Sequence, residues 1–181
     1  MDKRDRAERL AQILLDEVKT RIELGENLSK DPFSDAIIRQ IGNLRILPKG
    51  HSGRAGSSWQ KEANRRLSVG AKKMLEECST MKEFHKRTHN EHQLPVSATH
   101  KWMIENIDRI GYMGLLNKIY SYPMTTITWE EEKRLSKLGD PENRYKEAGI
   151  DIVKIAITPK EYYNEARSKN KINTKDKARK E

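Results

Sequence analysis

Two short segments of the sequence concentrate basic side chains, which bind phosphate and other anions. Residues 45–73 hold eight lysines and arginines against one acidic residue, a net charge of +7. Residues 166–181 hold seven against two, a net charge of +5. The whole chain carries a formal net charge of +9, so these segments contain all of its positive excess. Such a concentration favours nucleic acid as the partner, and a solvated face with a solubilising tail is the structural alternative.

A glycine-rich basic loop lies inside the first segment. The stretch Lys49-Gly50-His51-Ser52-Gly53-Arg54 has the flexibility to bring backbone N–H groups and the Arg54 guanidinium close to a phosphate. It lacks the Gly-Lys-Ser/Thr ending of a Walker loop, and a plain linker is the alternative. We expect the phosphates to be neutralised by five residues of the segment: Arg54, Arg65, Arg66, Lys72 and Lys73.

Residues 80–106 combine a capped helix, a short turn and a second helix. Thr80 starts a capping box for the first helix, and Ser97 can cap the second. Trp102 on the second helix is expected to pack back towards Phe84 on the first. A short turn followed by a helix with an anchoring aromatic is the arrangement that places a recognition helix against DNA.

The stretch Leu94-Pro95-Val96-Ser97-Ala98-Thr99, together with Trp102, resembles the helix-turn-helix of many bacterial, phage and transposon DNA-binding proteins. The resemblance implies that Ser97, His100 and Lys101 point outward from the second helix. Ser97 and His100 would then contact base edges, and Lys101 would reach a phosphate. An ordinary helical corner with a buried tryptophan is the structural alternative.

Three histidines could form a metal site. His85, His89 and His92 lie four and three residues apart, so a continuous helix would place all three on one face. His-x3-His is a workable zinc pair, but no Cys-x2-Cys or His-Glu-x2-His accompanies it. The sequence therefore predicts no metal and no cofactor, with these histidines as the alternative metal ligands.

A catalytic interpretation rests on one pair of residues. Arg87 and His92 resemble the Arg-x4-His motif of some helical ribonuclease toxins. Cys78 has no evident base partner, which argues against a nucleophilic cysteine. We expect no catalytic residues, and an RNA-binding or RNA-cleaving protein is the alternative function.

The elements that position these residues are predicted to be mainly α-helical. Apolar periodicity and capping residues predict helices over 2–24, from 32, 59–77, from 80, 97–108, 128–139, 142–148 and from 158. One short β-strand or hairpin is expected near 150–157, because that stretch is β-branched and alternating. A lone strand needs a partner, either a second copy of the chain or residues 125–127.

Length and composition predict one helical domain over 1–167 and a disordered basic tail over 168–181. Apolar and charged residues each make up 35%, no run is long enough to cross a membrane, and the single cysteine fits a cytoplasmic protein. We expect a sequence-specific or architectural protein that binds duplex DNA, with a homodimer as one arrangement. Its role would be that of a regulator or of an accessory factor of a phage or mobile element. A protein-interaction module whose basic segments only solubilise it is a further alternative.

Overall fold

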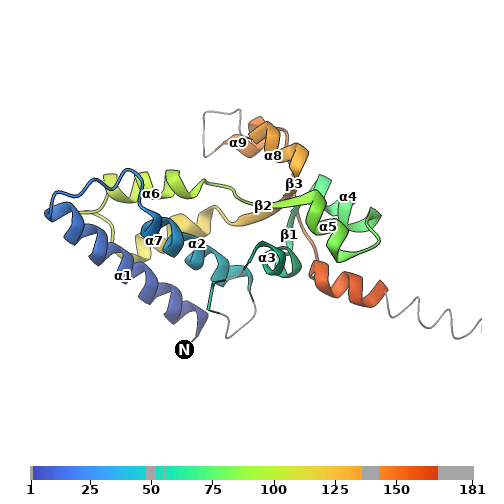
Figure 1. Ribbon diagram of the computed structural model, residues 1–181, viewed down its shortest axis with the longest axis horizontal. Helices are drawn as coiled ribbons and strands as arrows, with labels where there is room; N and C mark the ends of the chain where they lie inside the picture. Colours follow the sequence, from blue (N-terminus) through green and yellow to red (C-terminus); the bar gives the residue numbers. More distant parts are fainter. Residues whose placement is uncertain (1, 48–51, 55, 136–142, 167–181) are drawn as a thin grey trace, which may run out of the picture.

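The molecule is elongated, with a helical end and an end built around a small β-sheet (Figure 1). The structure is a computed structural model that describes residues 2–47, 52–54, 56–135 and 143–166. It confirms the mainly helical fold predicted from the sequence. The helical end is formed by α1 (Lys3–Glu23), α2 (Pro32–Ile46), α6 (Val96–Glu105) and α7 (Tyr112–Ser121).

Local capping explains where the first two helices begin and end. The Asp2 side chain accepts a hydrogen bond from the first turn of α1, and Asp31 does the same for α2. Pro32 occupies the first position of α2, where a backbone N–H would have no partner within the helix. Gly25 follows α1 with a φ of 76°, a conformation that favours glycine. These features confirm both predicted ends of α1 and the predicted start of α2.

One apolar cluster holds the helical end together. α1 packs against α2 and α7, and α2 packs against α6. The fully buried side chains of this cluster include Leu14, Val18, Ile41, Leu44, Met103 and Leu115. Their helical spacing on four different helices makes this the larger core of the molecule.

The sheet has the strand order β2-β3-β1-β4 within the described residues. Its strands are β1 (Arg66–Ser68), β2 (Thr88–His92), β3 (Met124–Thr128) and β4 (Ile152–Lys154). β3 runs antiparallel to β2 and parallel to β1, and β4 pairs antiparallel with β1. The sequence predicted at most one short strand or hairpin, near 150–157. β4 lies in the predicted region, but its partner is β1 instead of a second chain or residues 125–127.

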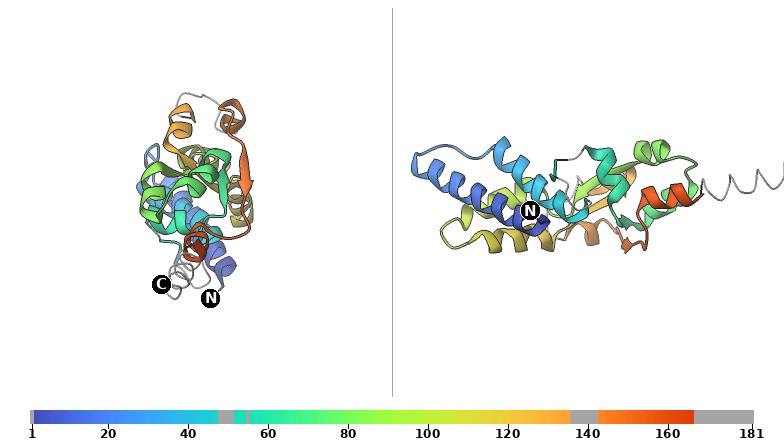
Figure 2. Two further views of the ribbon diagram at one scale, coloured as in Figure 1. Left: turned by 90° about the vertical axis from the view of Figure 1, so that its right-hand side faces the viewer. Right: turned by 90° about the horizontal axis from the view of Figure 1, so that it is seen from below.

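A long connection joins the two ends of the molecule. β2 and β3 are neighbours in the sheet, yet residues 93–123 leave the sheet between them and form α6 and α7. These helices pack beside α1 and α2 at the far end, as the views in Figure 2 also show. Half of the helical end, α6 and α7, is therefore inserted between two paired strands.

Short helices cover the sheet. They are α3 (Ser57–Ala63), α4 (Val69–Glu77), α5 (Met81–Arg87), α8 (Trp129–Leu135), α9 (Arg144–Glu147) and a helix over 159–166. Leu67, Phe84 and Tyr163 belong to one apolar cluster, and Ile127 and Tyr145 belong to another. Neighbouring residues of β4 contribute to different clusters, as the alternation of side chains along a strand requires.

The helix predicted over 59–77 is interrupted. α3 ends at Ala63, β1 follows, and α4 begins after Ser68, whose hydroxyl accepts a hydrogen bond from the Ala71 backbone N–H at 2.9 Å. Pairing of β1 with both β3 and β4 stabilises the extended conformation at this point. Tertiary pairing thus outweighs the local helical pattern.

The helix-turn-helix unit expected over 80–106 is not confirmed. Thr80 caps α5 as predicted, but residues 88–92 form β2 instead of continuing the helix. Phe84 lies in a cluster at the sheet end, whereas Trp102 packs against the cluster of the helical end. The first predicted helix therefore does not support the second.

Some predictions lie outside the described residues. These are residue 142 at the start of the helix predicted over 142–148, residues 49–51 of the glycine-rich loop and the tail over 168–181. Thr128 and Thr158 cap the helices that follow them, as predicted. None of the helices in the described ranges combines the length and the apolar character that a membrane span requires.

Candidate nucleic-acid interface

A pocket lined by basic residues lies where the end of α2 meets β1 and β4. Its volume is about 570 Å³, and its charged lining residues are Arg45, Arg65, Arg66 and Lys154. None of the described residues that line it is acidic. We call this site the cationic pocket.

The sheet register places two of these cations side by side. Arg66 on β1 is the direct cross-strand partner of Lys154 on β4. Directly opposed like charges destabilise a sheet by up to about 1 kcal/mol, because partners in register share one face. An anion bound between them would remove this repulsion.

The other two cations come from outside the sheet. Arg45 near the end of α2 donates a hydrogen bond to the Tyr120 backbone carbonyl, and its guanidinium lies 5.5 Å from the Tyr120 ring centroid. Arg65 precedes β1, is half exposed and lies 3.6 Å from a carboxylate oxygen of Glu161. Glu161 thus offsets part of one charge, and the other three cations have no ion pair within the described residues.

Hydrogen bonds fix the direction of Arg66. Its Nε donates to Thr125 Oγ1 at 3.0 Å, and its terminal nitrogen donates to Gln93 Oε1 at 3.1 Å. Burial lowers the pKa of the Arg66 guanidinium, and the charge of Arg45 lowers it further. Arginine stays charged despite such shifts, so the pocket contains a partly desolvated cation that no carboxylate of the described ranges neutralises.

Two further residues of the predicted basic block are neutralised elsewhere. Lys72 and Lys73 lie on α4, where their ammonium groups are 3.2 Å from Glu76 and 3.7 Å from Glu77. Both side chains are exposed, and neither lines the cationic pocket. The structure therefore brings together Arg65 and Arg66 but places Lys72 and Lys73 apart from them.

Arg54 also lies outside the cationic pocket. Its exposed side chain lines a second pocket, between α2 and β2. Gln40 and Asn43 of α2 donate hydrogen bonds to the Ser52 and Gly53 carbonyls, which hold this part of the loop on the helix.

The predicted recognition helix does not present the predicted residues. Ser97 and Lys101 are exposed on α6, but His100 is only 5% exposed, so the prediction that it points outward is wrong. α6 packs against α2, and His100 lies on the side of α6 that lines a pocket together with Asp35 and Arg39 of α2. Lys101 lies 3.8 Å from Glu105 one turn later. The outward face of α6 therefore contributes little net positive charge.

The three histidines do not share one face. His85 lies on α5, whereas His89 and His92 lie on β2 at positions that point to opposite sides of the strand. His89 stacks on Trp129 and lies 3.4 Å from Glu91. The described residues contain no group of histidine, cysteine, aspartate and glutamate side chains arranged to hold a metal ion.

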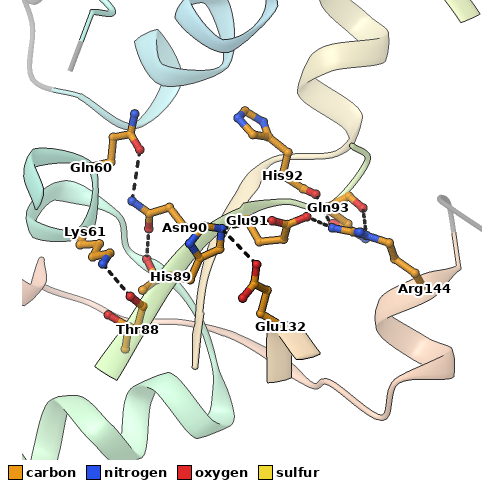
Figure 3. A network of polar contacts seen from close by, with 11 residues as sticks. Gln60, Lys61, Thr88, His89, Asn90, Glu91, His92, Gln93, Glu132 and Arg144 are labelled. Carbon is orange, nitrogen blue, oxygen red and sulfur yellow. Dashed lines mark hydrogen bonds and ion pairs between the residues drawn. The ribbon is translucent and has the colours of Figure 1, made fainter. Parts of the chain in front are cut away.

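Polar contacts anchor β2 from both sides (Figure 3). The buried Lys61 ammonium donates to the His85 and Thr88 carbonyls at 2.7 and 2.6 Å, and burial lowers its pKa. On the other side Arg144 forms an ion pair with Glu91 and donates to the His92 carbonyl at 3.1 Å. These cations serve the fold and are not available to a ligand.

The predicted ribonuclease pair is not assembled. Arg87 ends α5 beside Glu83 and Cys78, while His92 ends β2 and faces α2. Five strand residues span roughly 16 Å, so the two side chains lie at opposite ends of β2. Two charged residues of the cationic pocket were not among the predicted binding residues, Arg45 and Lys154. Lys154 was missed because only the strand register places it beside Arg66.

Comparisons with known proteins add no relative to this description. No protein-family model, curated protein or solved structure matches the chain. The functional argument therefore rests on the charges and contacts of the cationic pocket.

Proposed function

We propose that the protein binds nucleic acid through its phosphate backbone, with duplex DNA as the expected form and the cationic pocket as the main contact. The observation that carries the proposal is the convergence of Arg45, Arg66 and Lys154 from three elements on one pocket, whose lining has no acidic residue in the described part of the chain. Phosphate is the ligand that such a set of cations recognises best.

The proposed binding is backbone contact without base recognition by α6. His100 is buried and Lys101 lies beside a glutamate, so this helix offers few groups to a base edge. Backbone contacts depend strongly on salt and weakly on sequence. We therefore expect affinity that varies little between DNA sequences of equal length.

The proposal is tested by fluorescence anisotropy with a labelled duplex at several salt concentrations. Affinity should fall steeply with salt, and Arg45→Ala and Lys154→Ala should each reduce the slope of log affinity against log salt by about 1. Lys72→Ala is the matched control, because its partner Glu76 already neutralises it. Equal effects of all three variants, or a slope near zero, would contradict the proposal.

The nucleic acid itself is identified by competition. Unlabelled duplex DNA, duplex RNA and single-stranded DNA of one length compete for the bound probe at one salt concentration. We expect duplex DNA to compete best, and a stronger effect of RNA would favour the alternative RNA-binding function. Gel analysis of the RNA from the same reactions reports any cleavage.

A further inference from the structure

The second pocket, between α2 and β2, carries groups that the proposed function does not use. Its volume is about 430 Å³, within the range of about 300–1,000 Å³ that is typical of small-ligand sites. The polar residues relevant here are Arg39, Asn43, Arg54, Gln60, Asn90 and His92, and none of the described lining residues is acidic. We call it the α2 pocket.

Two arginines of the α2 pocket are available to an anion. Arg39 on α2 and Arg54 in the loop are both exposed. Neither guanidinium forms an ion pair or a hydrogen bond to any other residue in the described ranges. Arginine binds phosphate through paired N–H groups, so the pair offers a phosphate clamp without first breaking a protein contact.

Asn43 contributes a buried acceptor. Its side-chain nitrogen donates to the Gly53 carbonyl at 3.0 Å, which fixes the orientation of the amide. The residue is only 5% exposed, and its Oδ1 has no hydrogen-bond partner in the described part of the chain. A buried acceptor without a partner is energetically unfavourable, so a ligand that reaches it with a donor gains affinity.

His92 supplies an imidazole that can form hydrogen bonds in the α2 pocket. Figure 3 shows its ring turned away from the Glu91–Arg144 pair. Its Cε1 would lie 3.3 Å from a side chain added at Gly42, so the absence of that side chain lets the ring pack on α2. Burial, reinforced by the charge of Arg39, lowers the pKa of His92 to about 4. A neutral imidazole can both donate and accept a hydrogen bond.

From these contacts we infer that the α2 pocket binds a nucleotide, with Arg39 and Arg54 on the phosphate and Asn43 Oδ1 accepting from a hydroxyl or amino group. Inorganic phosphate offers only a P–OH on the anion itself, without a separate hydroxyl or amino group, and a nucleoside lacks the anion. A nucleotide carries both within one molecule. The nucleotide can be free or part of a nucleic-acid strand, and the experiment separates these sources.

The inference does not depend on the proposed function, because it uses different residues. Arg45→Ala with Lys154→Ala should leave mononucleotide affinity unchanged. Arg39→Ala with Arg54→Ala should weaken it at least about tenfold whether or not the cationic pocket binds DNA. Failure of one proposal is therefore distinguishable from failure of the other.

The test is isothermal titration calorimetry of the full chain with ribonucleoside monophosphates, the matching nucleosides and inorganic phosphate. Nucleotide should bind at least about tenfold more tightly than nucleoside or phosphate, because each of these retains only half of the contacts. The Arg39→Ala, Arg54→Ala double variant should weaken nucleotide binding at least about tenfold, since charge-assisted hydrogen bonds are lost. Both residues are exposed, so the double variant should fold, which circular dichroism checks.

Arg9→Ala is the matched control, because Arg9 is an exposed arginine on α1 that does not line the pocket. If mononucleotides do not bind but a short oligonucleotide loses at least about fivefold affinity in the double variant, the nucleotide belongs to a strand and the inference stands. Phosphate binding as tight as nucleotide binding would overturn it. The inference would also be overturned if the double variant bound every ligand with the same affinity as the wild type.

Discussion

The cationic pocket and the outer face of α6 both contain residues that the sequence marks as binding groups, yet they differ in how their charges are satisfied. In the pocket, Arg66 and Lys154 are cross-strand partners, and none of the described lining residues carries a carboxylate. On α6, Lys101 lies beside Glu105, and His100 is buried against α2. A basic residue is thus available to a polyanion only where the fold keeps acidic side chains away from it.

The same distinction applies within the basic block itself. Lys72 and Lys73 on α4 have glutamates one helical turn later, as is common on a solvated helix face. Arg45 and Arg66 use backbone and neutral side-chain oxygens as partners, so their charge is not neutralised. A count of charges along the sequence therefore does not show which basic residues are available to bind an anion.

The largest expected effect comes from reversing charge in the cationic pocket. Arg45→Glu with Lys154→Glu should lower duplex affinity about a hundredfold, because two phosphate contacts become repulsive. Lys72→Glu with Lys73→Glu changes net charge equally and should lower affinity less than about threefold, since only long-range attraction is lost. Anisotropy at one salt concentration measures both. Equal losses would remove the distinction between the two regions.

The second effect concerns the contribution of His100, which is buried on α6, to the stability of the fold. His100→Ala should lower the free energy of unfolding by about 1–3 kcal/mol, because it removes a packed side chain between α6 and α2. Duplex affinity and sequence preference should stay unchanged. Urea denaturation measures the first quantity, and anisotropy with two unrelated duplexes measures the second. A change of preference without a change of stability would restore α6 as a recognition helix.

The third effect is a pH dependence that originates in β2. The pKa of His92 falls from 6.5 to about 4 on folding, so between these values the unfolded chain binds a proton that the folded chain does not. The free energy of unfolding should therefore be highest above pH 6.5 and should fall as the pH drops towards 4.

His92→Gln should reduce this dependence. Burial also lowers the pKa of His85 and His89, so these residues contribute a similar slope in both proteins. The difference between wild type and variant isolates His92. Identical pH profiles from urea denaturation would show that its ring is not sheltered by α2.

The smallest effect is expected at Lys101. Its side chain is 79% exposed and its partner Glu105 is also exposed, so the pair contributes little to stability. Lys101→Ala should change the free energy of unfolding by less than about 0.5 kcal/mol. Duplex affinity should not change measurably. A loss of affinity comparable to that of Arg45→Ala would contradict the contrast drawn here.

Helix boundaries set by local chemistry were predictable from the sequence. Asp31, Thr80 and Thr128 each cap a helix with their own side chain, and such hydrogen bonds involve residues within one turn. The strands were harder to predict from the sequence. β2 has the sequence Thr-His-Asn-Glu-His, without the β-branched alternation that marks a strand, and it is extended because it pairs with β3 along its length.

The candidate site was predictable only in part. Arg65 and Arg66 were indicated by charge concentration, which is a property of neighbours in sequence. Lys154 joins them through the register between β1 and β4, and His100 is buried through the contact of α6 with α2. Both outcomes depend on pairings between distant segments, which one sequence does not specify.

The insertion of α6 and α7 between β2 and β3 determines how the molecule should come apart. α7 packs against α1, so removal of α1 would expose apolar side chains of α7 to water. α7 belongs to the segment that connects the paired strands β2 and β3. The two ends are therefore expected to melt in one cooperative transition, and neither should persist as an independently folded fragment after cleavage between them.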